Sequence, residues 1–327
     1  MIISKTPFRI SFFGGGTDYP VWYEEHGGAV LSTSIDKYCY ITVRYLPPFF
    51  EHKYRIVYSI VEGVKNISEI KHPVVRELLK YFNIEKGLEV HHDGDLPARS
   101  GLGSSSAFTV GMLNSLYALK GNIISKYELA KQAINVERNI LKENVGSQDQ
   151  VAVACGGFNK ITFYKDHSFR VEPMTLQKER ILQLEKHLML IFTGFSRFAS
   201  DIAAEQIKNT CERKKELNAM KQMVDHAVEI LNGGRDIAEF GKLLNESWQI
   251  KKCLSSKISS RELDDLYENA LKHGAIGGKL LGAGGGGFML LFVRPECREK
   301  LSDSLKEYLE VKFSFDNEGS QIIYYNP

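Results

Sequence analysis

The alternation of apolar and polar side chains near the N-terminus predicts β-structure. Ile41 and Val43 alternate with Thr42 and Arg44, which is the period of two expected of a strand. Other short apolar runs, separated by turns, fill the rest of the first ~60 residues. We therefore expect a mainly antiparallel sheet in this part of the chain.

Apolar residues three and four positions apart predict helices further along. Residues 72–82 show this spacing, and residues 127–142 carry apolar side chains on one side, so Glu137 lies on a helix whose other face is charged. Apolar runs predict further strands at residues 87–91, 158–163, 187–192 and 321–325.

Strands followed by helices in both halves of the chain predict a two-domain α+β protein. The length of 327 residues also exceeds what one hydrophobic core usually serves. A polar and charged stretch at 175–186 separates the halves, so we place the N-terminal domain at residues 1–180 and the C-terminal domain at 181–327.

Twelve of the 28 glycines gather in three short clusters flanked by apolar segments. Such clusters are typical of tight loops between packed elements, and three of them suggest one shared site. They are Gly14, Gly15 and Gly16; Gly101 and Gly103; and Gly277, Gly278, Gly282, Gly284, Gly285, Gly286 and Gly287.

The central cluster lies in PARSGLGSSSA, residues 97–107, and opens an apolar helix at residues 108–119. Two glycines turn the backbone sharply, and three serines then occupy the first helical turn. The free amide hydrogens and the positive dipole end of that turn suit a polyphosphate. A glycine turn with capping serines is the alternative interpretation. The Walker pattern GxxxxGK[ST] is absent.

The overall charge excludes partners that are recruited by bulk electrostatics. Lys and Arg number 42 against 40 Asp and Glu, so we expect no nucleic-acid or membrane partner. The five cysteines lie far apart without a CxxC pair, as in proteins of a reducing compartment. Because the first residues lack a signal-peptide core and no apolar run could cross a bilayer, we expect a cytoplasmic protein. The sequence leaves open whether the chain forms a homo-oligomer.

Three motifs follow one another along the chain: PFRISFFGGGTDYP at 7–20, PARSGLGSSSA at 97–107 and GGKLLGAGGGGF at 277–288. In this order they resemble the GHMP kinases, the family of galactokinase, homoserine kinase and mevalonate kinase. The resemblance implies a two-domain fold, with an N-terminal domain like domain 2 of ribosomal protein S5, a ferredoxin-like C-terminal domain and an active site between them. It also implies an ATP-dependent phosphotransferase with an alcohol group as acceptor and Mg²⁺ as a second cofactor.

The resemblance assigns the second motif to ATP. The residues placed around its phosphates are Pro97, Ser100, Gly101, Leu102, Gly103, Ser104, Ser105 and Ser106. Ser105 and Glu137 correspond to magnesium ligands, the oxygen donors that a hard cation bridging phosphates needs. Asp149 corresponds to the residue beside the acceptor hydroxyl, either as general base or as the group that orients it. Arg9 corresponds to a cation near the transferred phosphoryl group.

The first motif predicts a sugar acceptor. Thr17 and Asp18 repeat the galactokinase pattern, in which the aspartate binds sugar hydroxyls, whereas Gly15 and Gly16 replace its Glu-His pair and disfavour galactose. With GSQDQ and TGFSRFAS, the motif looks most like the branch that phosphorylates C1 of D-glycero-D-manno-heptose 7-phosphate to heptose 1,7-bisphosphate. L-fucose kinases or other sugar 1-kinases are the nearest alternative, and a non-catalytic sensor of ATP and sugar is an alternative of another class.

An acceptor that already carries a phosphate needs a cationic or amide-rich pocket at its far end. Arg197 is the candidate, with Gly284 and Gly285 of the third loop near it, although an exposed loop arginine explains Arg197 equally well. Lys279 and Arg99 are weaker candidates.

Overall fold

The structure, a computed structural model, describes residues 1–194 and 199–327. Its larger sheet has nine strands in this part of the chain, with a central path in the order β13-β1-β2-β5-β3-β4. β6 and β12 both pair with β2, and β7 pairs with β6. The strands are β1 (Ile2–Phe13), β2 (Gly28–Tyr45), β3 (Tyr54–Val57), β4 (Val61–Val64), β5 (Leu88–Gly94), β6 (Phe158–Phe163), β7 (Phe169–Pro173), β12 (Phe315–Asp316) and β13 (Gln321–Tyr325).

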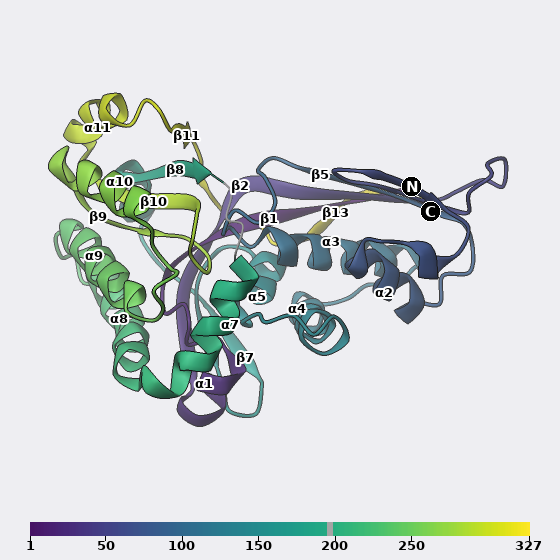
Figure 1. Ribbon diagram of the computed structural model, residues 1–327, viewed down its shortest axis with the longest axis horizontal. Coiled ribbons are helices and arrows are strands. Elements are labelled where there is room, and N and C mark those ends of the chain that lie inside the picture. Colours follow the sequence, from purple (N-terminus) through teal and green to yellow (C-terminus); the bar gives the residue numbers. More distant parts are fainter. Residues whose placement is uncertain (195–198) are drawn as a thin grey trace.

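Helices cover one face of this sheet (Figure 1). The central one, α3, packs on β1 and β2, and twelve of its sixteen residues are buried because it is apolar nearly all round. It begins directly after the second glycine cluster, as expected. The helices of this lobe are α1 (Pro20–His26), α2 (Pro73–Tyr81), α3 (Ser104–Leu119), α4 (Lys126–Asn135) and α5 (Gln148–Cys155), with a 3₁₀ turn at Ile67–Glu69 and a π-helical turn at Val136–Ile140. A further helix, α6 (Lys178–His187), leads into the other lobe, where Arg180 donates to the carbonyl oxygens of Ile230 and Leu231.

A smaller antiparallel sheet in the order β11-β8-β10-β9 forms the other lobe (Figure 1). Its strands are β8 (Leu188–Gly194), β9 (Ala275–Leu280), β10 (Gly287–Val293) and β11 (Leu309–Val311). The helices here are α7 (Ala199–Asn209), α8 (Lys214–Asn232), α9 (Ala238–Lys252), α10 (Arg261–Lys272) and α11 (Arg298–Ser304), with 3₁₀ turns at Thr210–Glu212 and Pro295–Cys297. No helix in the described residues is both long and apolar enough to span a membrane.

The end of β1 lies where the two lobes meet. Phe12 and Phe13 pack edge-on against Phe240 of α9, with ring centroids 5.5 and 5.1 Å apart. The backbone carbonyl of Phe12 also accepts a hydrogen bond from Lys279 of β9, at 2.8 Å. Because β1 carries Arg9 and leads into the first glycine cluster, this contact fixes the first motif against the C-terminal lobe.

The predicted elements mostly recur with shifted ends. Strand β6 has the expected bounds, and the helix predicted at 127–142 divides into α4 and the π-helical turn. The polar stretch 175–186 folds largely as α6. At the end of the chain, β12 and β13 return to the larger sheet, which therefore contains residues from both sides of the predicted division at residue 180.

Candidate active site

The second and third glycine clusters pack backbone against backbone. Gly101 has a φ of +83°, and a Cβ atom there would lie 2.5 Å from the carbonyl oxygen of Leu281. A Cβ atom at Gly287 would lie 2.4 Å from the carbonyl oxygen of Ser100. Both positions exclude side chains, since real Cβ contacts are not this short. The glycines thus let loops from the two lobes come together at one point.

The start of α3 offers backbone donors to an anion. Gly103, at the N-cap with a φ of +74°, turns the chain into the helix and provides no side-chain cap. The amide hydrogens of Ser104, Ser105 and Ser106 therefore have no acceptor within the helix, and the positive end of its dipole lies with them. Ser106 is buried, whereas Ser105 is exposed. This arrangement suits phosphate, as the sequence predicts.

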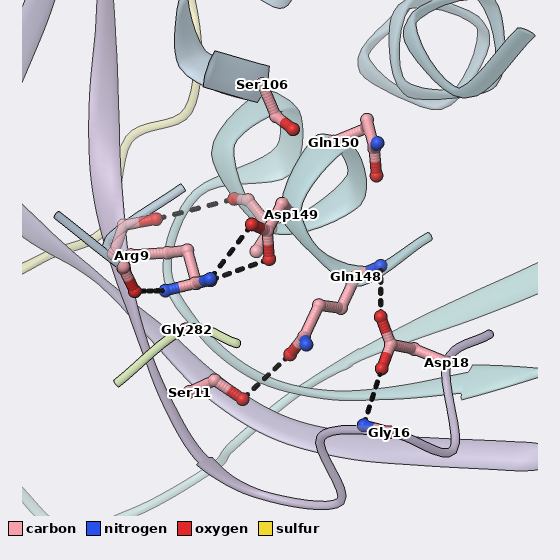
Figure 2. Close-up of polar contacts among 12 residues, drawn as sticks. Arg9, Ser11, Gly16, Asp18, Ser106, Gln148, Asp149, Gln150 and Gly282 are labelled. Carbon is pink, nitrogen blue, oxygen red and sulfur yellow. Dashed lines mark hydrogen bonds and ion pairs between the residues drawn. The ribbon is translucent and has the colours of Figure 1, made fainter. Parts of the chain in front are cut away.

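Arg9 and Asp149 form a bidentate ion pair beside this turn (Figure 2). Arg9 Nε lies 2.8 Å from Asp149 Oδ1, and Nη2 lies 2.9 Å from Oδ2. The third donor, Nη1, reaches the carbonyl oxygen of Gly101 at 2.7 Å. Arg9 is 2% exposed and Asp149 is 29% exposed. The guanidinium thus holds the carboxylate from behind, and Asp149 keeps an open side.

Glu137 is buried in the π-helical turn instead of facing solvent. Its Oε2 accepts hydrogen bonds from Ser106 Oγ, at 3.0 Å, and from Gln150 Nε2. Its Oε1 is buried without a hydrogen-bond partner. Burial raises the pKa of Glu137 to about 7 and outweighs the hydrogen bonds from Gln150 and Ser106, which act in the opposite direction. An unpaired carboxylate oxygen of this kind fits a hard cation.

The first glycine cluster, Thr17 and Asp18 form a loop at residues 14–18, here called the acceptor loop, and the side chains of Thr17 and Asp18 hold it in place. The Thr17 hydroxyl lies 2.8 Å from the carbonyl oxygen of Gly14 and 2.9 Å from that of Ala29. Asp18 accepts hydrogen bonds from the backbone nitrogen atoms of Gly16, at 2.9 Å, and Gln148, at 3.3 Å. Burial, followed by the charge of Asp149, raises the pKa of Asp18 to about 6.

Comparison with known proteins identifies the family. The profile described as "GHMP kinases N terminal domain" matches residues 68–157, and "GHMP kinases C terminal" matches residues 223–311. A D-glycero-alpha-D-manno-heptose 7-phosphate kinase from Campylobacter jejuni is 31% identical over 97% of each chain. The chain belongs to the GHMP kinase family. It is an ATP-dependent phosphotransferase, as the motifs predict.

Solved structures share the whole fold of this GHMP kinase. A D-glycero-D-manno-heptose 1-phosphate kinase from Bacteroides thetaiotaomicron superposes with a TM-score of 0.81 at 24% identity, and each chain is fully covered. A galactokinase from Lactococcus lactis, complexed with galactose, gives 0.75 at 20% identity over 98% of this chain and 94% of its own. The predicted α+β GHMP kinase fold is confirmed.

Of the residues predicted for the sugar phosphate, Arg197 lies outside the described residues, and its role stays a prediction. In the third loop, Gly285 N donates to the carbonyl oxygen of Ile258 at 3.0 Å. A Cβ atom at Gly284 would lie 2.8 Å from Ile258 Cα. Both glycines thus pack against the segment before α10. Arg99 is exposed and has a φ of +60°.

Two buried lysines lie close to Arg9 in this GHMP kinase. Lys251, which the sequence analysis missed, donates from Nζ to the carbonyl oxygens of Leu280 and Gly282. Burial, followed by the charge of Arg9, lowers the pKa of Lys251 to about 7. The pKa of Lys279 is also well below its ordinary value, first because of burial and then because of Lys251. The third motif contains Lys279, but no sequence signal distinguishes Lys251 from other helix lysines.

Proposed function

We propose that this GHMP kinase transfers the γ-phosphoryl group of ATP to the C1 hydroxyl of D-glycero-D-manno-heptose 7-phosphate, giving heptose 1,7-bisphosphate and ADP. The observation that carries the proposal is the 31% identity to a heptose 7-phosphate kinase over 97% of both chains. The open side of Asp149, next to a helix N-terminus that suits phosphates, supports it.

We assign the triphosphate of ATP to the second motif, Pro97 and Ser100–Ser106. The first-turn amide hydrogens of α3 would bind phosphate oxygens, and Gly101 and Gly103 let this turn pack closely against Leu281 and Arg9. The chain itself supplies these donors, so the near-neutral net charge of +2 is no obstacle.

We assign Mg²⁺ to Glu137 with a serine of the first turn of α3. The unpaired Oε1 of Glu137 provides a fitting oxygen donor. Ser105 is the predicted serine, and Ser106 is the one in contact with Glu137, at 3.0 Å. When bound, the ion would neutralise negative charge on the phosphates.

We assign Asp149 to the acceptor. Its free side would accept a hydrogen bond from the C1 hydroxyl, whose oxygen attacks the γ-phosphorus while the bond to the β-phosphate oxygen breaks. The hydroxyl proton passes to the carboxylate. This proton transfer need not precede the attack, because a loose transition state does not require a fully deprotonated nucleophile. Arg9 keeps the carboxylate aimed through two hydrogen bonds of 2.8 and 2.9 Å.

We assign the sugar itself to the first motif and the third loop. Gly15 and Gly16 would lie beneath it. Asp18, which the sequence predicts to bind sugar hydroxyls, is 1% exposed and both its carboxylate oxygens accept backbone hydrogen bonds, so we assign it, with Thr17, to shaping the loop. We further propose that Gly284, Gly285 and Arg197 bind its phosphate, as the sequence predicts.

An L-fucose kinase is the second candidate, favoured by a bifunctional fucokinase/GDP-fucose pyrophosphorylase from Arabidopsis thaliana that is 24% identical over 94% of this chain. The chain covers only 31% of that protein. A coupled ADP-release assay with heptose 7-phosphate, L-fucose, galactose and mevalonate tests the choice. We expect turnover of the heptose phosphate above all others; turnover of fucose alone would refute the proposal.

A further inference from the structure

The three consecutive glycines of the first motif differ in what the protein requires of them. Gly14 has a φ of +83°, and a Cβ atom there would lie 1.9 Å from the carbonyl oxygen of Ala29. Gly16 has a φ of +101°, where side chains are strained. Gly15 has neither restriction: its φ is not positive, and a Cβ atom would make only ordinary contacts. Neither the backbone nor the described neighbours require a glycine at 15.

The atoms that face Gly15 are polar. A Cβ atom at Gly15 would lie 3.7 Å from Nε2 of Gln148 and 4.0 Å from Oγ of Ser11. No other described heavy atom lies within 4 Å of that point, apart from the glycine's own chain neighbours. Space is therefore left over Gly15. The side-chain amide of Gln148, the residue that precedes Asp149 in the sequence, lies at the edge of this space.

Gln148 is held in place at both ends (Figure 2). The Ser11 hydroxyl donates to Gln148 Oε1 at 2.7 Å, and Ser11 itself is 5% exposed on β1. The backbone nitrogen of Gln148 donates to Asp18 Oδ2 at 3.3 Å. With Oε1 engaged, the amide presents Nε2 towards Gly15, and no described group accepts a hydrogen bond from it. A fixed donor beside an opening suits a ligand oxygen.

We propose that Gln148 determines acceptor specificity: its Nε2 donates a hydrogen bond to the hydroxyl next to the reacting one, the C2 hydroxyl of the sugar, and Ser11 orients the amide. This inference rests on the proposed function. Arg9 binds Asp149 and Ser11 binds Gln148, and because Arg9 and Ser11 lie two residues apart on β1, both side chains come to the same face of that strand. Gly15 leaves room for the ring that carries both hydroxyls.

The test is a comparison of the wild type and Gln148→Leu on two acceptors, heptose 7-phosphate and its 2-deoxy analogue. For the wild type, we expect the analogue to lower kcat/KM about tenfold, the loss of one hydrogen bond. For Gln148→Leu, we expect the KM for heptose 7-phosphate to rise about tenfold. This variant should then use heptose 7-phosphate and its 2-deoxy analogue with equal kcat/KM. The KM for ATP should stay within about twofold, because the amide faces the acceptor loop.

Ser11→Ala tests the orienting role. Without the hydroxyl the amide can rotate and present oxygen instead of nitrogen, so we expect the preference for the parent sugar to fall to about threefold. The matched control is Gln132→Leu, which removes an amide whose Oε1 also accepts a hydrogen bond from a hydroxyl, that of Tyr117, at 2.6 Å. It should keep the full preference for the parent sugar.

Two results would overturn the inference. Gln148→Leu could retain the tenfold preference for the parent sugar, or it could raise the KM for the sugar and the KM for ATP equally. A thermal melt of each variant checks that the fold is kept. Failure of the proposed function has a different signature, since the wild type would then not use heptose 7-phosphate. In that case, the same comparison on the sugar that is used, such as L-fucose with its 2-deoxy analogue, still tests Gln148.

Discussion

Asp18→Asn should change how the stability of this kinase depends on pH. The Asp18 side chain is 1% exposed, and each carboxylate oxygen accepts one backbone hydrogen bond, from Gly16 and from Gln148. Burial and the nearby charge of Asp149 raise its pKa from 3.8 to about 6. The folded protein therefore binds more protons than the unfolded chain between these values, and it loses stability as the pH rises through them.

The size of the effect follows from the shift. A rise of the pKa from 3.8 to about 6 corresponds to about 3 kcal/mol of the free energy of unfolding, lost between pH 4 and pH 7. Asparagine does not titrate, and its amide oxygen can still accept one of the two backbone hydrogen bonds. Its amide nitrogen cannot accept the other, and this loss costs about 1–2 kcal/mol of the free energy of unfolding at all pH values. The variant should thus be less stable than the wild type at pH 4 and about 1–2 kcal/mol more stable at pH 7.

Urea denaturation at several pH values between 4 and 8, without nucleotide or sugar, measures this difference. The matched control is Asp95→Asn, which alters an exposed carboxylate that also accepts a backbone hydrogen bond, from Tyr38 N at 2.8 Å. Its stability relative to the wild type should vary far less with pH. A difference between Asp18→Asn and the wild type that is the same at pH 4 and pH 7 would refute the reasoning.

Four further substitutions test the other assignments. Asp149→Ala should lower phosphoryl transfer about 10²- to 10⁴-fold in an ADP-release assay, while calorimetry shows unchanged ATP binding; near-native turnover would remove its assigned role. Gly101→Ala should lower the free energy of unfolding by more than about 2 kcal/mol, since its φ is +83° and its Cβ would meet a carbonyl oxygen at 2.5 Å. The control Gly121→Ala, at a φ of +73° with open space around it, should lose only about 1 kcal/mol. Glu137→Gln should abolish the gain in ATP affinity that Mg²⁺ gives, measured by calorimetry with and without the ion. Wild-type stability should rise more steeply than that of Lys251→Met above pH 7, because the lowered pKa of Lys251 makes the unfolded chain bind more protons there; parallel denaturation curves would contradict this.

The parts of the site that the sequence predicts are those encoded by short, local patterns. A glycine turn before serines predicts the exposed start of α3, and the structure has it at Gly103 and Ser104. The family motifs also single out Arg9 and Asp149, whose side chains form an ion pair. The glycine turn can be predicted from a few consecutive residues alone, whereas the roles of Arg9 and Asp149 follow from the resemblance of their motifs to those of the family.

The parts that the sequence did not predict depend on contacts between distant segments. The hydrogen bond from Ser11 to Gln148 joins residues 137 positions apart. Lys251 lies among helix lysines that look alike in sequence, and only the packing of α9 on β9 buries it. The π-helical turn at Val136–Ile140, which contains Glu137, has no signal in the sequence, where one continuous helix is predicted. Such features follow from the assembled fold and not from local propensity.

The buried cations give the near-zero net charge of +2 a local meaning. Arg9 has Asp149 as its counterion, but in the described residues neither Lys251 nor Lys279 forms an ion pair, and both bond to backbone carbonyl oxygens. Burial disfavours their charged forms, and the pKa of each is lowered. A phosphate bound beside Arg9 would place negative charge near both lysines and so favour their protonation. Positive charge would then form behind the glycine loops when phosphate binds, so that the charge is placed at the site itself and not on a basic surface.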